Sequence, residues 1–143
     1  MEKIIIDSSV AVKWFVVETD SLTANEILLE WKQGLWKFLA PDLIYAEYGN
    51  IIWKKQIFQG FDAADAAFAL EGFQQIPFTL TPAKAIFDDA FKIAVKHQRT
   101  FYDSLYPALS VKENCGFVTT DEKFYNAVKQ DFPRMILLAD WQQ

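Results

Sequence analysis

The run Lys3-Ile4-Ile5-Ile6-Asp7, near the start of the chain, decides the fold class. Three consecutive β-branched residues that stop at an acid are typical of a short buried strand. Further apolar runs of this kind alternate with longer stretches of helical periodicity, and they occupy residues 36–40, 76–80, 116–119 and 135–139. Because no two-residue hairpin turn joins these runs, we expect crossover connections, a mostly parallel sheet and an α/β fold.

The stretches between these strands predict the helices. Apolar spacing and turn residues place the helices at 8–17, 19–33, 41–58, 63–73, 82–97, 100–115 and 121–129. Pro41 and Pro82 are each expected in the first turn of a helix, the second behind Thr81 as its N-cap residue. The chain has no visible linker or repeat. Residues 1–143 are therefore expected to form one domain, with four to five short strands flanked by helices on both faces.

Composition excludes several classes of protein. The chain has 143 residues, of which 52% are hydrophobic, and this content excludes intrinsic disorder. A single cysteine, Cys115, excludes an intramolecular disulfide and a cysteine-based zinc site, and it favours a reducing, cytoplasmic location. The apolar run 4–6 is too short for a signal peptide, and no stretch is long enough to span a membrane. The net charge of −5 argues against a passive, basic nucleic-acid binder.

Four acidic residues stand where the predicted fold could use them chemically. Asp7 and Asp121 follow predicted strands, at whose carboxyl ends α/β proteins bind ligands, but either could simply cap the next helix. Glu47 lies on the apolar face of a predicted helix, where a carboxylate must be paired, protonated or cation-bound unless it reaches water at the edge. Asp103 is three residues after Thr100, as in a capping box. Its neighbours are largely apolar: Tyr102, Leu105, Tyr106 and Leu109.

If these acids converge, their mutual repulsion needs an explanation. Two carboxylates ~5 Å apart repel by roughly 3 kcal/mol at an effective dielectric of about 20, which forces protonation or recruits a cation. Oxygen-only ligation suits Mg²⁺ or Mn²⁺, and an all-acid site of this kind is typical of phosphodiester chemistry. Periodicity alone does not place the four residues together.

Four motifs in order resemble those of PIN domains, in particular the VapC-type toxins of toxin–antitoxin pairs. The motifs are 4–15 (IIIDSSVAVKWF), 41–50 (PDLIYAEYGN), 102–110 (YDSLYPALS) and 118–124 (VTTDEKF). The match covers nearly the whole chain. It implies a single PIN-like domain that acts as a Mg²⁺- or Mn²⁺-dependent ribonuclease, with an RNA substrate and a cognate antitoxin protein. It also implies a homodimer or higher homo-oligomer and no association with a membrane.

The resemblance assigns roles to individual residues. The catalytic and metal-binding residues would be Asp7, Glu47, Asp103 and Asp121, with Glu47 binding a second ion or orienting the attacking water. Ser9 and Thr119 would donate hydrogen bonds to the acids, or they cap helices. Asn50 would support Glu47, or it lies on the polar side of its helix. Setting aside the four acids from the chain's 19 leaves 15 against 14 basic residues, so the net charge no longer argues against an RNA substrate.

One departure from the pattern and several weaker features remain. Pro107 falls inside the third motif, so that helix either kinks or begins at Pro107. His97 fits a helix C-terminus better than a catalytic base. Basic residues are sparse: Arg99 and Arg134 are the only arginines, and the candidate contacts to an RNA backbone are Lys13, Lys54, Lys55 and Lys96. A further set could line an apolar groove for a partner, although we expect at least two members in the core: Phe58, Phe61, Phe68 and Phe73.

Two other functions are compatible with parts of the sequence. A PIN-like domain that no longer cleaves, and instead serves as a binding or regulatory module, would share all four motifs. A receiver-like phosphoacceptor domain is also α/β with an acidic pocket, but it needs paired acids after the first strand and a lysine after the last. Here Asp7 is followed by two serines, and the last apolar run leads to Asp140 and Trp141.

Overall fold

The structure is a computed structural model that describes residues 1–141. Five parallel strands form one sheet in the order β3-β2-β1-β4-β5. Their bounds are β1 Glu2–Ile6, β2 Trp36–Pro41, β3 Thr79–Thr81, β4 Gly116–Thr119 and β5 Met135–Leu137. The predicted α/β class and the parallel sheet are confirmed.

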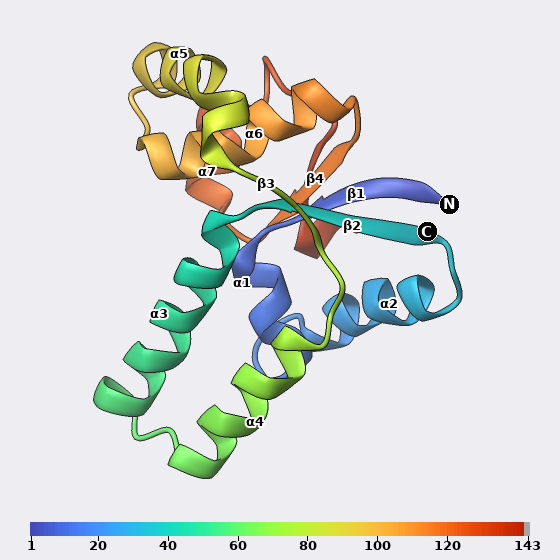
Figure 1. The fold of residues 1–143 in the computed structure, drawn as a ribbon, viewed down its shortest axis with the longest axis vertical. Coiled ribbons are helices and arrows are strands. Elements are labelled where there is room, and N and C mark those ends of the chain that lie inside the picture. Colours follow the sequence, from blue (N-terminus) through green and yellow to red (C-terminus); the bar gives the residue numbers. More distant parts are fainter. Residues whose placement is uncertain (142–143) are drawn as a thin grey trace.

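Helices cover both faces of this sheet (Figure 1). Their bounds are α1 Ser8–Ala11, α2 Ser21–Lys32, α3 Leu43–Phe58, α4 Ala63–Gln74, α5 Phe87–His97, α6 Phe101–Glu113 and α7 Glu122–Val128. Short 3₁₀ turns add η1 Val12–Trp14, η2 Ala83–Ile86 and η3 Leu138–Asp140. Helices α3 and α4 form a pair that projects away from the sheet (Figure 1). None of the described helices is long and apolar enough to cross a membrane.

The central strand β1 divides the interior into two cores. Ile4 and Ile6 belong to the core shared with α1 to α4, whereas Ile5 belongs to the core shared with α5, α6 and α7. This division follows from the strand geometry, because successive side chains point to opposite faces of a sheet. The run of three isoleucines is therefore needed because both faces are covered.

Several predicted boundaries are wrong, and the prolines explain two of them. Pro41 is the last residue of β2 rather than the first residue of a helix, and Asp42 N–H continues the pairing with a bond of 2.9 Å to the carbonyl of Thr81. Pro82 precedes the 3₁₀ turn η2, and Thr81 lies in β3 instead of capping a helix.

Other errors concern length. The helix expected at 8–17 consists of the four-residue α1 and the turn η1. The strand expected at 76–80 pairs only from Thr79, although Ile76 is buried in the core. The strand expected at 135–139 ends at Leu137.

Helix α6 continues through Pro107 without a break. It begins after Thr100, whose Oγ1 accepts the N–H of Asp103 at 3.0 Å, so the alternative start at Pro107 is wrong. Proline has no N–H to donate to the carbonyl of Asp103 four residues earlier. Asp103 thus lies in the first turn of α6, with its backbone N–H capped and its carbonyl free of a bond from residue 107.

Candidate active site

Asp7 is held by hydroxyl groups from two separate parts of the chain. Its Oδ2 accepts hydrogen bonds from Ser9 Oγ at 2.8 Å and from Thr119 Oγ1 at 2.7 Å, and its Oδ1 lies 3.3 Å from Ser8 Oγ. Asp7 occupies the N-cap position of α1, yet its side chain accepts no capping hydrogen bond. The interpretation of this carboxylate as a helix cap is therefore wrong, and the hydroxyls fix its orientation.

Thr119 joins the two motifs at the ends of β1 and β4. Its side chain is buried, donates to Asp7 and accepts the N–H of Asp121 at 3.1 Å. Ser9 Oγ makes a parallel connection, because it accepts the N–H of Thr120 at 3.3 Å. These bonds tie the carboxyl ends of the two paired strands together around Asp7.

Asp121 lies at the exposed margin of this arrangement. Its carboxylate accepts the N–H of Phe124 at 2.9 Å, so the interpretation of Asp121 as the cap of α7 is confirmed. One oxygen is used by this cap and the other makes no hydrogen bond with residues 1–141. Capping and a role in the acid group are therefore compatible for this residue.

Glu47 points from α3 towards α6. The hydroxyl of Tyr106 donates to Glu47 Oε1 at 2.6 Å. The ring of Tyr106 is buried and stacks on Phe117 of β4, with centroids 5.3 Å apart. In the sequence, Tyr106 stands out only as one of the apolar neighbours of Asp103. The hydroxyl of Tyr106 could have pointed to a polar neighbour, because a buried tyrosine normally finds a hydrogen-bond partner.

Burial and mutual repulsion raise the pKa values of these acids. Burial raises the pKa of Asp7, and the charge of Asp103 raises it further, against the hydrogen bonds from Thr119 and Ser9. Burial also raises the pKa of Glu47 to about 7, with contributions from Asp7 and Asp103, although the bond from Tyr106 lowers it. The pKa of Asp103 is raised by burial first and then by Asp121. The charges thus link the four predicted residues in a chain: Asp103 acts on Asp7 and Glu47, Asp7 acts on Glu47, and Asp121 acts on Asp103.

The one basic residue among these influences is Arg99, whose charge lowers the pKa of Asp103. Its Nε is buried and has no hydrogen-bond partner among the described residues. No basic residue within 1–141 forms an ion pair with any of the four acids. The site therefore has a deficit of positive charge, which either protons or a cation must supply.

The side-chain oxygens near Asp7 suit a hard divalent cation, but they are not arranged to surround one. All side-chain donors are oxygens, from carboxylates and hydroxyls, as Mg²⁺ or Mn²⁺ prefers. However, no group of three or more acidic, histidine or cysteine side chains in residues 1–141 is arranged to hold an ion. The residues thus suit an ion that contacts one or two carboxylates directly and keeps several waters, as Mg²⁺ commonly does.

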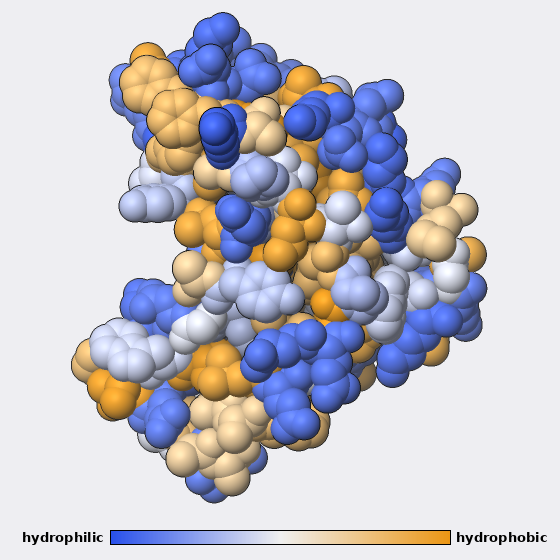
Figure 2. Space-filling model, in the orientation of Figure 1, coloured by the Kyte–Doolittle hydropathy of each residue, from blue (hydrophilic) through white to orange (hydrophobic). Residues whose placement is uncertain are grey.

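One side of the molecule is hollowed beside the carboxyl ends of the strands. The carboxyl ends of β1 and β2 point towards α1 and α3 (Figure 1). On that side, the space-filling view is hollowed between the surface over α5 and α6 and the surface over α3 (Figure 2). The hollow lies on the side of the sheet where Asp7 follows β1 and Asp121 follows β4.

The other sequence candidates are not gathered at this site. Asn50 is exposed on α3, and its side chain makes no hydrogen bond with the described residues. Lys13 and Lys55 pair with Glu18, and Lys96 pairs with Asp131 at 2.7 Å. Lys54 is exposed on α3.

Two of the four phenylalanine candidates lie in or against the core and two are exposed, and His97 lies at a helix end. Phe73 is buried and Phe61 packs against the same core, whereas Phe58 and Phe68 are exposed. At least two of the four phenylalanines therefore belong to the core. His97 is the last residue of α5, and its Nε2 lies 3.0 Å from Asp131 Oδ2, so it pairs with that residue and, within residues 1–141, with none of the four predicted site acids.

Comparison with known proteins places the chain in a class of nuclease folds. A model of the PIN domain matches residues 4–130, so the chain belongs to the PIN domain family, whose members are typically metal-dependent nucleases. Among solved structures, it is similar to PAE2754 from Pyrobaculum aerophilum, with a TM-score of 0.69 and 22% identity over 97% of this chain and 93% of that chain. At this identity the likeness is one of fold. A comparison with curated proteins found no match.

Proposed function

We propose that this chain is a Mg²⁺- or Mn²⁺-dependent endoribonuclease that hydrolyses RNA phosphodiester bonds. The observation that carries the proposal is the environment of Asp7. Its carboxylate is fixed by Ser9 and Thr119, and it lies near Glu47 and Asp103 with no ion-pair partner among residues 1–141 to neutralise it. A fold that tolerates this repulsion gains nothing from it in stability, and strongly perturbed acids in an open hollow are typical of functional sites.

The residues would divide the work according to their positions. Asp7 and Asp103 would hold the ion most directly, and Asp121 would act at the exposed margin. Glu47, with a pKa of about 7, would bind a second ion or hold the attacking water as an acceptor. A bound divalent cation supplies activation of that water and neutralisation of charge on the phosphate and the leaving oxygen. Ser9 and Thr119 would keep Asp7 in one orientation through the reaction.

The direct test is cleavage of RNA with and without divalent metal. We expect activity with Mg²⁺ or Mn²⁺, none in EDTA, and a loss of at least about 100-fold in Asp7→Asn, because loss of a ligand should exceed the 10–100-fold that follows loss of a supporting contact. Asp65→Asn, an exposed acid on α4, is the control of equal charge change and should keep full activity. Equal cleavage by the Asp7 variant, or cleavage that survives EDTA, would contradict the proposal.

A non-cleaving binding module is the second candidate. The observation in its favour is that residues 1–141 contain no ready group of three metal ligands. Calorimetric titration with Mn²⁺ separates the two functions, since the module should bind no ion in the presence or absence of RNA. The ribonuclease should bind Mn²⁺ more tightly when an uncleavable RNA supplies phosphate oxygens.

The partners proposed for the chain follow from its exposed apolar side chains. As the toxin of a VapBC-type pair in the cytoplasm, it would need surfaces for an antitoxin and for a second copy. Phe87, Phe91 and Val95 are exposed at intervals of four residues along α5. Trp53 and Phe58 are exposed on α3.

We also propose that residues 1–143 form one domain, because β1 contributes to both cores.

A further inference from the structure

A pocket of about 460 Å³ lies at the amino-terminal ends of the strands. Asp7 and Asp121 follow the opposite, carboxyl ends of the strands. Its lining includes the start of β1, β2, β4 and β5, together with Trp141 beyond the last strand. A neighbouring hollow of about 650 Å³ shares Glu2, Trp36, Ile136 and Trp141 with it. Both volumes lie in the range of roughly 300–1,000 Å³ that is usual for small-molecule sites.

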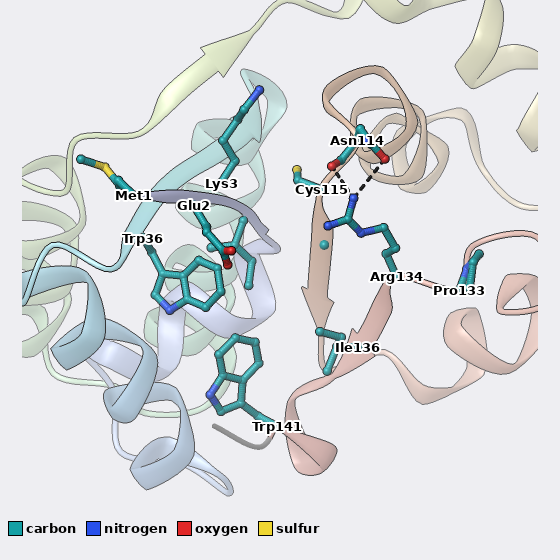
Figure 3. Close-up of a pocket in the computed structure, with 12 residues that line it drawn as sticks. Met1, Glu2, Lys3, Trp36, Asn114, Cys115, Pro133, Arg134, Ile136 and Trp141 are labelled. Atoms are coloured by element: carbon teal, nitrogen blue, oxygen red, sulfur yellow. Dashed lines mark hydrogen bonds between the residues drawn. The ribbon is translucent and has the colours of Figure 1, made fainter.

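One wall of this pocket is aromatic. Trp36 and Trp141 lie with their ring centroids 5.8 Å apart and their planes at 63°. Trp36 is fixed in place because its Nε1 donates to Glu30 Oε1 at 2.8 Å. Figure 3 shows both indole rings on the same side of the pocket. Two of the five tryptophans in the chain thus gather at one concave surface.

The opposite wall carries a fixed guanidinium group. Arg134 Nη1 donates to the side-chain oxygen of Asn114 at 3.0 Å and to its backbone carbonyl. The other nitrogens of Arg134 make no hydrogen bond with residues 1–141, so they are available to a ligand. Arg134 is one of only two arginines in the chain.

The charge of the lining differs from that of the whole protein. The lining has two basic residues, Lys3 and Arg134, and one acidic residue, Glu2, whereas the chain has 14 basic and 19 acidic residues. Lys3 already pairs with Glu113 at 3.4 Å, but Arg134 has no ion pair within the described residues. Glu2 extends between the tryptophans and Arg134 (Figure 3). The pocket therefore offers an aromatic surface, a free cation and a free carboxylate.

We propose that this pocket binds a nucleotide, separately from the acid site. The base would stack on one of the two indole rings, Trp36 or Trp141, and meet the other at an angle, since the two planes are inclined at 63° and indole rings stack on bases of any sequence. The phosphate would accept hydrogen bonds from Arg134, whose planar guanidinium suits phosphate oxygens. Glu2 would accept N–H donors from the edge of the base, which favours guanine because it presents adjacent donors. The nucleotide would be free in solution or part of an RNA strand. The proposal does not depend on ribonuclease activity.

The test is calorimetric titration of the whole chain with GMP in the presence of EDTA. Without metal, the acid site repels phosphate, so binding reports on the pocket and is separate from cleavage. We expect GMP to saturate one site and to bind at least about tenfold more tightly than inorganic phosphate, because stacking adds to the ionic contact. A short guanine-containing RNA that binds more tightly than GMP would identify a strand as the source, and a weaker one would identify the free nucleotide.

Matched variants localise the binding. Trp141→Leu and Arg134→Gln should each weaken GMP binding about tenfold or more. Trp53→Leu removes an exposed tryptophan on α3, and Lys92→Gln removes an exposed charge on α5, so both should bind GMP as the unchanged protein does. Thermal unfolding shows whether the variants are folded, and saturable quenching of tryptophan fluorescence by GMP gives a second measurement on the unchanged chain. Absence of saturable binding, or equal losses in Arg134→Gln and Lys92→Gln, would overturn the proposal.

Discussion

The acidic residues of this protein fall into two groups with opposite surroundings. At the carboxyl ends of the strands, the pKa values of Asp7, Glu47 and Asp103 are raised by burial and by one another's charges. Elsewhere, Glu18 and Asp131 each contact two basic side chains. The pKa of Asp131 is lowered, first by the hydrogen bond from Lys96.

The difference shows how charge is distributed between stability and function. The second group has basic partners that the strand-end acids lack among residues 1–141: Lys13 and Lys55 lie against Glu18, and Lys96 lies against Asp131. The paired acids support the fold, whereas the unpaired acids oppose it until a proton or a cation arrives. The two groups should therefore respond in opposite ways to the same kind of substitution.

The largest expected effect comes from neutralising one acid in each group. Asp7→Asn keeps groups that can bond to Ser9 and Thr119 but removes a repelled charge, so we expect a higher melting temperature in metal-free buffer and loss of cleavage. Glu18→Gln removes the acid between Lys13 and Lys55, which should lower the unfolding free energy by about 1 kcal/mol and leave cleavage unchanged. Differential scanning calorimetry in EDTA measures both shifts. If both variants lose stability, the comparison of the two groups is wrong.

The second effect is a difference in activity between phenylalanine variants of two buried tyrosines. Tyr106 donates to Glu47, whereas Tyr48 donates to the carbonyl of Ala69 at 2.8 Å and stacks on Phe73. Replacing either one by phenylalanine removes one hydrogen bond and should cost about 1 kcal/mol of stability. Only Tyr106→Phe should also weaken Mn²⁺ binding and cleavage, by about 10–100-fold, because only its hydroxyl orients a site acid. Equal activity in the two variants would remove Tyr106 from the site.

The third effect is a dependence of stability on pH. Because the pKa of Glu47 in the folded protein is raised to about 7 from an ordinary value of 4.5, the folded state retains a proton that the unfolded state loses. Stability from this group is full below pH 4.5 and falls as the pH rises to about 7, by about 3 kcal/mol at most. Urea unfolding from pH 4 to 8 measures this fall, and Glu47→Gln should reduce it. Saturating Mg²⁺ should oppose the fall at pH 7, since it favours the ionised acids.

The smallest effect belongs to the exposed paired acid. The lowered pKa of Asp131 means that its contribution is present above the pKa of an unfolded aspartate and is lost as the pH falls through the lowered value. Asp131→Asn should therefore give a slight decrease in melting temperature at pH 7. This decrease should disappear in about 1 M salt, where exposed charges are screened. A decrease that persists in high salt would show that Asp131 acts by packing instead.

Much of the fold followed from local patterns in the sequence. The isoleucines before Asp7 predict a strand covered on both faces, and Thr100 predicts the start of α6 in spite of Pro107. The errors arise where a residue has two possible uses. Pro41 suits a helix start as well as a strand end, and only the pairing of β2 with β3 makes it the latter. That pairing joins residues about forty positions apart and is invisible to local periodicity.

The candidate site was predictable in its acids and incomplete in its contacts. Asp7 could be assigned to a strand end, but the sequence did not decide between a cap and a site residue. The decision comes from Thr119, which lies 112 positions away and donates to Asp7 instead of leaving it free to cap α1. The link between Tyr106 and Glu47 was missed for the same reason, because it spans 59 positions and two helices.

The bond between Thr119 and Asp7 also has a consequence for the timing of synthesis. A chain leaving the ribosome carries Asp7 first, but the hydroxyl that fixes this carboxylate is added 112 residues later. At about 5–20 residues per second, the growing chain spends roughly 6–20 s with Asp7 made and its orienting partner absent. Asp121 is added later still. A PIN domain built this way completes its group of acids, and the contact that orients Asp7, only after nearly all of its fold has been translated.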